Sequence, residues 1–61
     1  MNEYVIFYKN GTEEVIKGKY LHIERNLKVL LIDNIIVASL HDIKHVRFLV
    51  KGYYQLIDMI M

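Results

Sequence analysis

The chain has 61 residues and a formal net charge of +1; 54% of its residues are hydrophobic and 25% are charged. This length limits the chain to one domain, and the high apolar content excludes intrinsic disorder. The small net charge gives no strong field for nucleic acid or for basic partners, and it argues against a nucleic-acid mimic. Without cysteine, disulfides and thiolate metal sites are excluded.

We expect one domain over residues 1–61, with a β-sheet core in residues 1–51 and a C-terminal helix or tail in residues 53–61. No signal peptide is expected, because no basic and then apolar segment precedes a small-residue cleavage site. The longest apolar run is far shorter than the ~18 residues that a membrane span needs. These features predict a cytoplasmic protein without a membrane partner.

Residues 3–18 predict a β-hairpin, because Asn10-Gly11 lies between β-branched and aromatic residues. A type I′ turn needs positive φ at both central positions, which asparagine and glycine accept. The resulting two-residue loop brings Val5 opposite Ile16. Gly18 then indicates a bulge or a sharp corner, because glycine inside a strand-like run is typical of both.

Residues 20–24 alternate between apolar and polar side chains, which predicts a half-buried strand. Leu21 and Ile23 are expected to face the core. The opposite side of this strand holds Tyr20, His22 and Glu24. Asn26 marks the next turn.

Residues 27–40 predict a second hairpin with a turn at Asp33-Asn34, two residues that tolerate the left-handed conformation. Regular pairing gives this hairpin two apolar faces. The predicted core face comprises Leu27, Val29, Leu31, Ile36, Ala38 and Leu40. The other face carries four large aliphatic side chains toward solvent, which is not expected of a monomer: Leu30, Ile32, Ile35 and Val37.

After a short turn, a last strand is predicted with Val46, Phe48 and Val50 facing inward. The outward residues of this strand are His45, Arg47 and Lys51, and Gly52 ends it. A stripe at i, i+3, i+4 and i+7 then predicts an amphipathic helix, and it comprises Tyr53, Leu56, Ile57 and Ile60. A helix this short is unstable alone, so we expect it to dock on another apolar surface.

These elements predict a mainly β protein: a small, strongly bent antiparallel sheet or an SH3-like barrel of five to six strands, with a short C-terminal helix. The alternative is an open meander completed by a second copy of the chain. The second apolar face predicts a two-fold homodimer, whose expected interface comprises Leu30, Ile32, Ile35, Val37, Leu56, Ile57 and Ile60. The other interpretation is a monomer whose terminal helix folds back over that face.

No catalytic, cofactor-binding or metal-binding residues are predicted. The segment from His41 to His45 resembles the zinc signature H-E-x-x-H, but on a strand the two imidazoles would stand ~13 Å apart. Ser39, His41 and Asp42 include the residue types of a catalytic triad, but no glycine-rich elbow surrounds the serine. We therefore expect a protein that is not an enzyme and that uses no cofactor.

Two kinds of surface residue are candidates for partner binding. Tyrosine is enriched at binding hot spots, and the candidates of this kind are Tyr20, Tyr53 and Tyr54. Basic residues near aromatic rings bind single-stranded nucleic acid in small barrels. That set comprises Lys17, Lys19, Arg25, Lys28, Arg47 and Lys51, with Tyr20 and His22 nearby. Glu13, Glu14 and Glu24 dilute this charge, which favours a protein partner.

The run that includes YVIFYKNGTEEVIKGKYLHIERN and IVASLHDIKHVRF is similar to short β-rich proteins of phages and prophages. The likeness lies in strand pattern and turn placement. Some of those proteins inhibit host enzymes or anti-phage defence systems. The resemblance implies a phage or mobile-element inhibitor that binds a bacterial host or defence protein in the host cytoplasm. The alternative is a small-barrel protein that binds single-stranded nucleic acid.

Overall fold

The computed structural model describes the backbone of residues 2–50 and 53–58 and the side chains of residues 2–49. These residues form seven strands: β1 (Asn2–Tyr8), β2 (Glu13–Gly18), β3 (Leu21–Glu24), β4 (Val29–Ile32), β5 (Ile35–Ser39), β6 (Ile43–Val50) and β7 (Tyr53–Asp58). The strands pair antiparallel in a large sheet, with the order β2-β1-β6-β7, and a small sheet, with the order β3-β4-β5. The mainly β prediction is confirmed, but in the described residues no continuous ladder joins the two sheets into a closed barrel.

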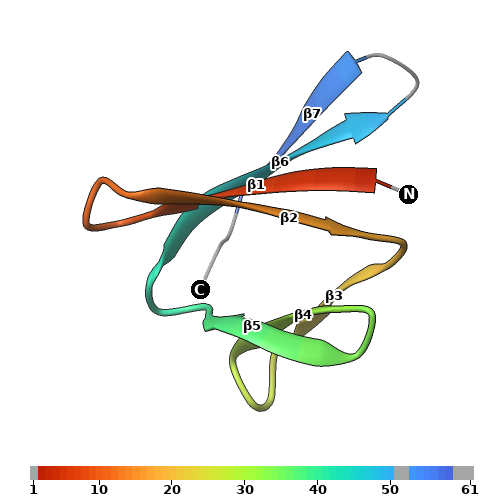
Figure 1. The fold of residues 1–61 in the computed structure, drawn as a ribbon. Coiled ribbons are helices and arrows are strands. Elements are labelled where there is room, and N and C mark those ends of the chain that lie inside the picture. Colours follow the sequence, from red (N-terminus) through yellow and green to blue (C-terminus); the bar gives the residue numbers. More distant parts are fainter. Residues whose placement is uncertain (1, 51–52, 59–61) are drawn as a thin grey trace.

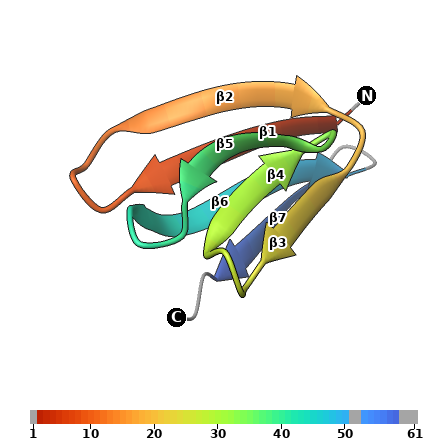
Figure 2. The same ribbon diagram turned by 90° about the horizontal axis from the view of Figure 1, so that it is seen from below.

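The core lies between the two sheets and draws its side chains from both of them. Figure 1 shows the small sheet lying across one side of the large sheet, and Figure 2 shows it in front of the large sheet. The half-buried ring of Phe48 packs beside Tyr4, with ring centroids 5.9 Å apart. Phe48 and Val46 therefore face inward as predicted, while the side chains of Val50 and Lys51 lie outside the described residues. The buried side chains are Tyr4, Ile6, Leu30, Ile32, Leu40, Ile43 and Val46.

The β1–β2 hairpin has a longer loop than the sequence predicts. Gly11 N donates a hydrogen bond to Tyr8 O at 3.1 Å, and Gly11 has a φ of +90°. This arrangement is typical of a type I turn followed by a glycine bulge. The register is consequently shifted by one residue, and Val5 pairs with Val15 instead of Ile16. Since such a shift exchanges the faces of a strand, Ile16 packs against the core and Val15 is 54% exposed.

The chain turns from the large sheet to the small sheet at Gly18, where the sequence predicts a bulge or corner. A Cβ atom at Gly18 would overlap Cγ2 of Ile32, so only glycine allows this close approach. The Asp33 carboxylate accepts hydrogen bonds from the backbone amides of Lys19 at 3.0 Å and Tyr20 at 2.9 Å. Asp33 N donates to Tyr20 O at 2.9 Å. The corner is therefore attached to the turn between β4 and β5.

The turn of the second hairpin is confirmed at Asp33 and Asn34, which have φ angles of 52° and 66°. The pairing beyond this turn is not regular, because β5 contains a β-bulge. Leu30 pairs with Ala38, which leaves Val37 as an extra residue in β5. The extra residue changes which of the later residues in β5 face the core.

The prediction of which face of this hairpin meets the core is wrong. Leu30 is 0% exposed, whereas Leu27 is 71% and Ile36 is 60% exposed. Only Leu40 of the predicted core face is fully buried, and it follows the bulge. Because both faces are apolar, the hydrophobic pattern of the hairpin alone does not distinguish them. The neighbouring strand does, since Ile23 packs against the core and pairs with Leu30.

The predicted C-terminal helix is wrong over the described residues. Tyr53–Asp58 forms strand β7, which pairs with β6 so that Tyr53 lies opposite Val50. A helix of nine residues is unstable without tertiary contacts. Tyrosine and isoleucine have high strand propensity, and the ladder with β6 satisfies backbone groups of the segment. Residues 59–61 lie outside the described part of the chain.

Alanine in place of Leu30 should lower the free energy of unfolding by about 2–5 kcal/mol, because the substitution leaves a cavity in the core. Leu27→Ala removes the same atoms from an exposed side chain. It should change the free energy of unfolding by less than about 0.5 kcal/mol. Denaturant-induced unfolding of the two variants measures the difference. Equal losses, or a larger loss for Leu27→Ala, would contradict the assignment of the core face.

Replacing Asp33 by glycine tests the hydrogen bonds at the corner. Glycine accepts the positive φ of this position but removes the carboxylate, which should cost about 1.5–3 kcal/mol in free energy of unfolding. Asn34→Gly is the matched control, since Asn34 also has positive φ, and it should change stability by about 0.5 kcal/mol or less. If thermal unfolding shows the same effect for both variants, the carboxylate does not stabilise the corner.

Candidate functional site

The outer face of the large sheet, on the side away from the small sheet, presents a mixed apolar and charged surface. In one row of this face, Val5 pairs with Val15 on one side and with Arg47 on the other. In the next row, Phe7 pairs with Glu13 and with His45. We define the large-sheet face as Val5, Phe7, Val15, His45 and Arg47.

On this face, the ring of Phe7 contacts two side chains from β6. Its ring centroid is 4.5 Å from that of His45, with 38° between the ring planes. The Arg47 guanidinium carbon lies 5.2 Å from the centroid of the Phe7 ring. A guanidinium at this distance over a ring gains a cation–π interaction. Pairing of β1 with β6 therefore assembles a cluster whose members are far apart in the sequence.

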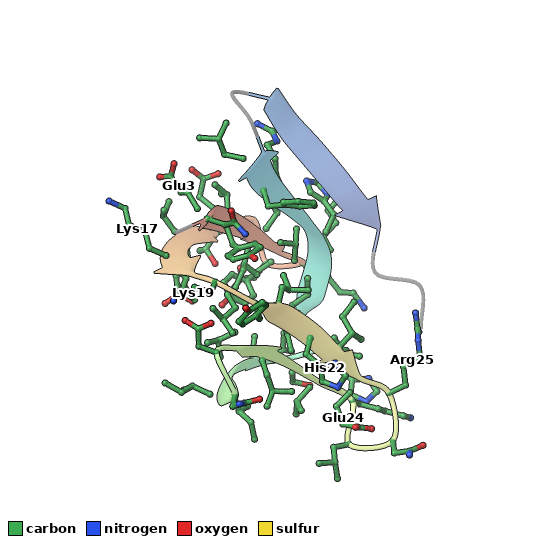
Figure 3. The ribbon with its side chains drawn as sticks, turned by 90° about the vertical axis from the view of Figure 1, so that its right-hand side faces the viewer. Glu3, Lys17, Lys19, His22, Glu24 and Arg25 are labelled. Carbon is green, nitrogen blue, oxygen red and sulfur yellow. The ribbon has the colours of Figure 1, made fainter. Side chains whose placement is uncertain are left out.

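The border of the large-sheet face carries charges of both signs. Glu3 of β1 pairs with Lys17 of β2, and Figure 3 shows both side chains at the large sheet. Phe7 and Val5 are half-buried, while Val15 and Arg47 are exposed. This combination of partly exposed apolar side chains, an aromatic ring and an arginine is characteristic of the central residues of protein interfaces.

An open groove of about 460 Å³ lies at the C-terminal end of β1, beside the β1–β2 loop. The groove is bounded on one side by the loop after β5, and Lys9 N donates to Asp42 O at 2.8 Å. The hydroxyl of Tyr8 donates to Oε1 of Glu14 at 2.7 Å. The lining residues are Tyr8, Lys9, Asn10, Thr12, His41 and Asp42.

Among the titratable groups that line this groove, Tyr8 has a clearly raised pKa. Burial, the hydrogen bond to Glu14 and the negative charges of Glu14 and Asp42 together raise its pKa from 10.0 to about 12, and burial is the largest of these causes. Each of these effects disfavours the phenolate. The phenol is therefore protonated at neutral pH and retains its hydrogen bond to Glu14.

The hairpin residues predicted for self-association differ widely in burial. Leu30 and Ile32 are buried in the core of the single chain, so their assignment to an exposed surface is wrong. Val37 is half-buried and packs against the core, whereas Ile35 is 66% exposed. The cause is the inverted face described above together with the bulge in β5.

Strand β7, at the edge of the large sheet, contains most of the C-terminal residues predicted for binding. By register, Leu56 is opposite Arg47 and Ile57 is opposite Val46, while Tyr54 is opposite Leu49. The side chains of these β7 residues and of Tyr53, and the whole of Ile60, lie outside the described residues. Their predicted roles in self-association and partner binding stay predictions.

Tyr20, the other tyrosine predicted to bind a partner, is 74% exposed at the corner between the sheets.

The basic residues predicted for nucleic-acid binding are divided between the two sheets. Figure 3 shows Lys17 at the large sheet and Arg25 with His22 at the small sheet. His22 Nε2 is 3.9 Å from Oε2 of Glu24. The remaining members are Lys19 at the corner, Lys28 in the β3–β4 turn, Arg47 on the large-sheet face, and Lys51 outside the described residues.

The two histidines of the HDIKH segment occupy different surroundings. His41 lines the groove, whereas His45 contacts Phe7 on the large-sheet face. The Ser39 hydroxyl accepts a hydrogen bond from the backbone amide of His41 at 3.3 Å. Among the side chains that the structure describes, no group of three or more histidine, aspartate or glutamate residues is arranged to hold a metal ion.

Comparisons with protein-family models, curated proteins and solved structures found no match to this chain. Its described part contains no helix long and apolar enough to cross a lipid bilayer.

The sequence did not predict the cluster of Phe7, His45 and Arg47. It placed His45 and Arg47 on the outward side of their strand. No pattern in the sequence indicated that this strand pairs with β1, which brings Phe7 into contact with them.

Spectroscopic titration of Tyr8 checks the electrostatics of the groove. Its folded pKa of about 12 exceeds the ordinary 10.0, so the native state retains a proton that the unfolded state has released between these pH values. The stabilisation linked to Tyr8 is complete below pH 10 and is lost as the pH rises toward 12. Glu14→Gln should lower the pKa while leaving it above 10, because burial remains.

Glu13→Gln is the control for this titration. The substitution removes the same charge as Glu14→Gln does, but Glu13 lies on the opposite face of β2. The control should leave the Tyr8 transition, isolated by comparison with Tyr8→Phe, within a few tenths of a pH unit of the wild type. Equal shifts for the two glutamine variants would show that general charge, rather than the bond from Tyr8 to Glu14, sets this pKa.

Proposed function

We propose that the protein is a non-enzymatic protein-binding module that binds its partner on the large-sheet face. The observation that carries the proposal is the contact of the Phe7 ring with the His45 ring, centroids 4.5 Å apart, and with the Arg47 guanidinium carbon at 5.2 Å. Interface hot spots combine aromatic and arginine side chains surrounded by residues that exclude water. Val5 and Val15 supply the apolar surroundings here.

The chemistry of this face indicates the chemistry of the partner. Apolar side chains of the partner would cover Val5, Phe7 and Val15 and remove them from water. A carboxylate at the border of the partner's patch would be attracted by the positive charge of Arg47. Contact with Phe7 restricts the guanidinium before binding, which reduces the entropy that association costs.

The resemblance to short phage and prophage proteins supports a more specific form of the proposal. In this form the protein is a phage or mobile-element inhibitor, and the partner is a host or anti-phage defence protein in the bacterial cytoplasm. A standard interface buries ~800 Å² on each partner, which is under a fifth of the 4466 Å² surface of this chain. A domain of this size can therefore block a site on a larger enzyme.

Single-stranded nucleic acid is the second candidate partner, because Phe7 and Arg47 also provide a ring and a cation on one sheet face. Proteins of that class combine a base-stacking ring with a continuous basic groove. Lys17 is the nearby basic residue of the predicted set on this sheet, while Arg25 and Lys28 belong to the β3–β4 turn. The division of the basic side chains favours the protein partner.

Affinity capture from the bacterium that encodes the chain tests the function. The tagged wild-type chain should retain one protein in stoichiometric amount, and Arg47→Glu should reduce the retained amount at least about tenfold, because it reverses the charge of the anchor. Lys28→Glu makes the same charge change in the β3–β4 turn and should leave capture unchanged. Thermal unfolding of each variant verifies that it is folded.

Fluorescence anisotropy with a labelled single-stranded oligonucleotide separates the two classes of partner. Tight binding at physiological salt that weakens steeply as salt increases would support nucleic acid. If the oligonucleotide binds in this way and capture recovers no protein whose retention depends on Arg47, the protein-binding proposal is wrong.

A further inference from the structure

The outer face of the small sheet is a second apolar surface, separate from the large-sheet face. By register, Leu31 of β4 lies between His22 and Ile36, and Val29 lies between Glu24 and Ser39. The opposite side of this sheet is covered by the core. We define the small-sheet face as Val29, Leu31 and Ile36, with a border of His22, Glu24 and Ser39.

We infer that the small-sheet face binds the same face of a second copy of this chain and forms a two-fold dimer. The inference goes beyond the proposed function, because it concerns a different sheet. In a two-fold contact one patch meets itself, so the patch must be free of charges that would repel their own copies. The small-sheet face meets this requirement at its centre, which consists of Val29, Leu31 and Ile36.

The charges around this face also favour a second copy over an acidic or basic partner. Lys28 and Asp33 are the only charged residues between positions 27 and 40. Asp33 accepts hydrogen bonds from the backbone at the corner. At the border, Glu24 lies beside His22, so the border includes a carboxylate that accepts hydrogen bonds and an imidazole that can donate one, and it can complement itself. A net charge of +1 leaves little repulsion between two copies.

The dimensions of the sheet determine how strong this dimer can be. Three strands of four or five residues present a rectangle of roughly 14 Å by 16 Å. The area buried on each copy is therefore smaller than the ~800 Å² of a standard interface. Even standard interfaces can be as weak as micromolar, so we expect a reversible dimer with a micromolar or weaker dissociation constant.

Addition at the edge of β5 is a less suitable way to associate. Ile35–Ser39 has no charged residue to block pairing with another strand. However, the bulge at Val37 interrupts the regular spacing of backbone groups that an added strand requires. Packing of face against face avoids this obstacle and closes after two copies.

Sedimentation equilibrium of the full chain over a broad micromolar concentration range tests the inference. The average mass should rise from 7.3 kDa toward twice that value as concentration increases. Ile36→Lys should weaken association at least about tenfold, because it places two like charges in the centre of the contact. Val15→Lys is the matched control, since it makes a comparable change at an exposed valine of the other sheet, and it should dimerise as the wild type does.

Ile36→Thr is a second variant that keeps a β-branched side chain and removes apolar area, and it should weaken the dimer less than lysine does. A monomer throughout the concentration range overturns the inference, and so does a dimer that both Ile36 variants leave unchanged. These results do not depend on capture of a partner through Arg47. A monomeric chain that still captures its partner would refute the dimer alone, and a dimer that captures nothing would refute the proposed function alone.

Discussion

The relation between the two sheets depends on the carboxylate of Asp33. It binds the backbone amides of Lys19 and Tyr20, so the start of β3 is attached to the turn that ends β4. Gly18 allows this approach because a side chain there would overlap Ile32. Once β3 is fixed beside β4, the register directs Leu30 toward the large sheet. A short acidic side chain at a left-handed turn thus orients the sheet that forms half of the core.

Local patterns in the sequence predicted most of the strands, and non-local pairing determined what they missed. The alternation around Ile23, the corner at Gly18 and the turn at Asp33 are all confirmed, because each depends on a few neighbouring residues. The register of β1 with β2 depended on the choice between two loop types that Asn10-Gly11 permits. The helical stripe near the C-terminus was misleading, since a partner strand changes the preferred conformation of a short apolar segment.

The candidate binding surface was less predictable than the fold. Outward positions for His45 and Arg47 followed from alternation within one strand. Their contact with Phe7 required the pairing of the first strand with the sixth, for which the sequence carries no short-range signal. The choice between two apolar faces of residues 27–40 was also underdetermined, because a hydrophobic pattern identifies the buried face only when the other face is polar.

The bulge at Val37 has a consequence for how this chain tolerates changes in length. A regular β5 starting from the Ile32–Ile35 pair would alternate so that Leu40 pointed away from the core, yet Leu40 is buried. Val37 therefore acts as a spacer that reverses the phase of the strand. Deleting this one residue would leave a regular strand in which Ala38 still pairs with Leu30 and Ser39 with Val29, so Leu40 would keep its inward orientation. Deleting a residue after the bulge, such as Ser39, would instead bring Leu40 opposite Val29 and turn it away from the core, so the effect of a change in length depends on where in β5 it falls.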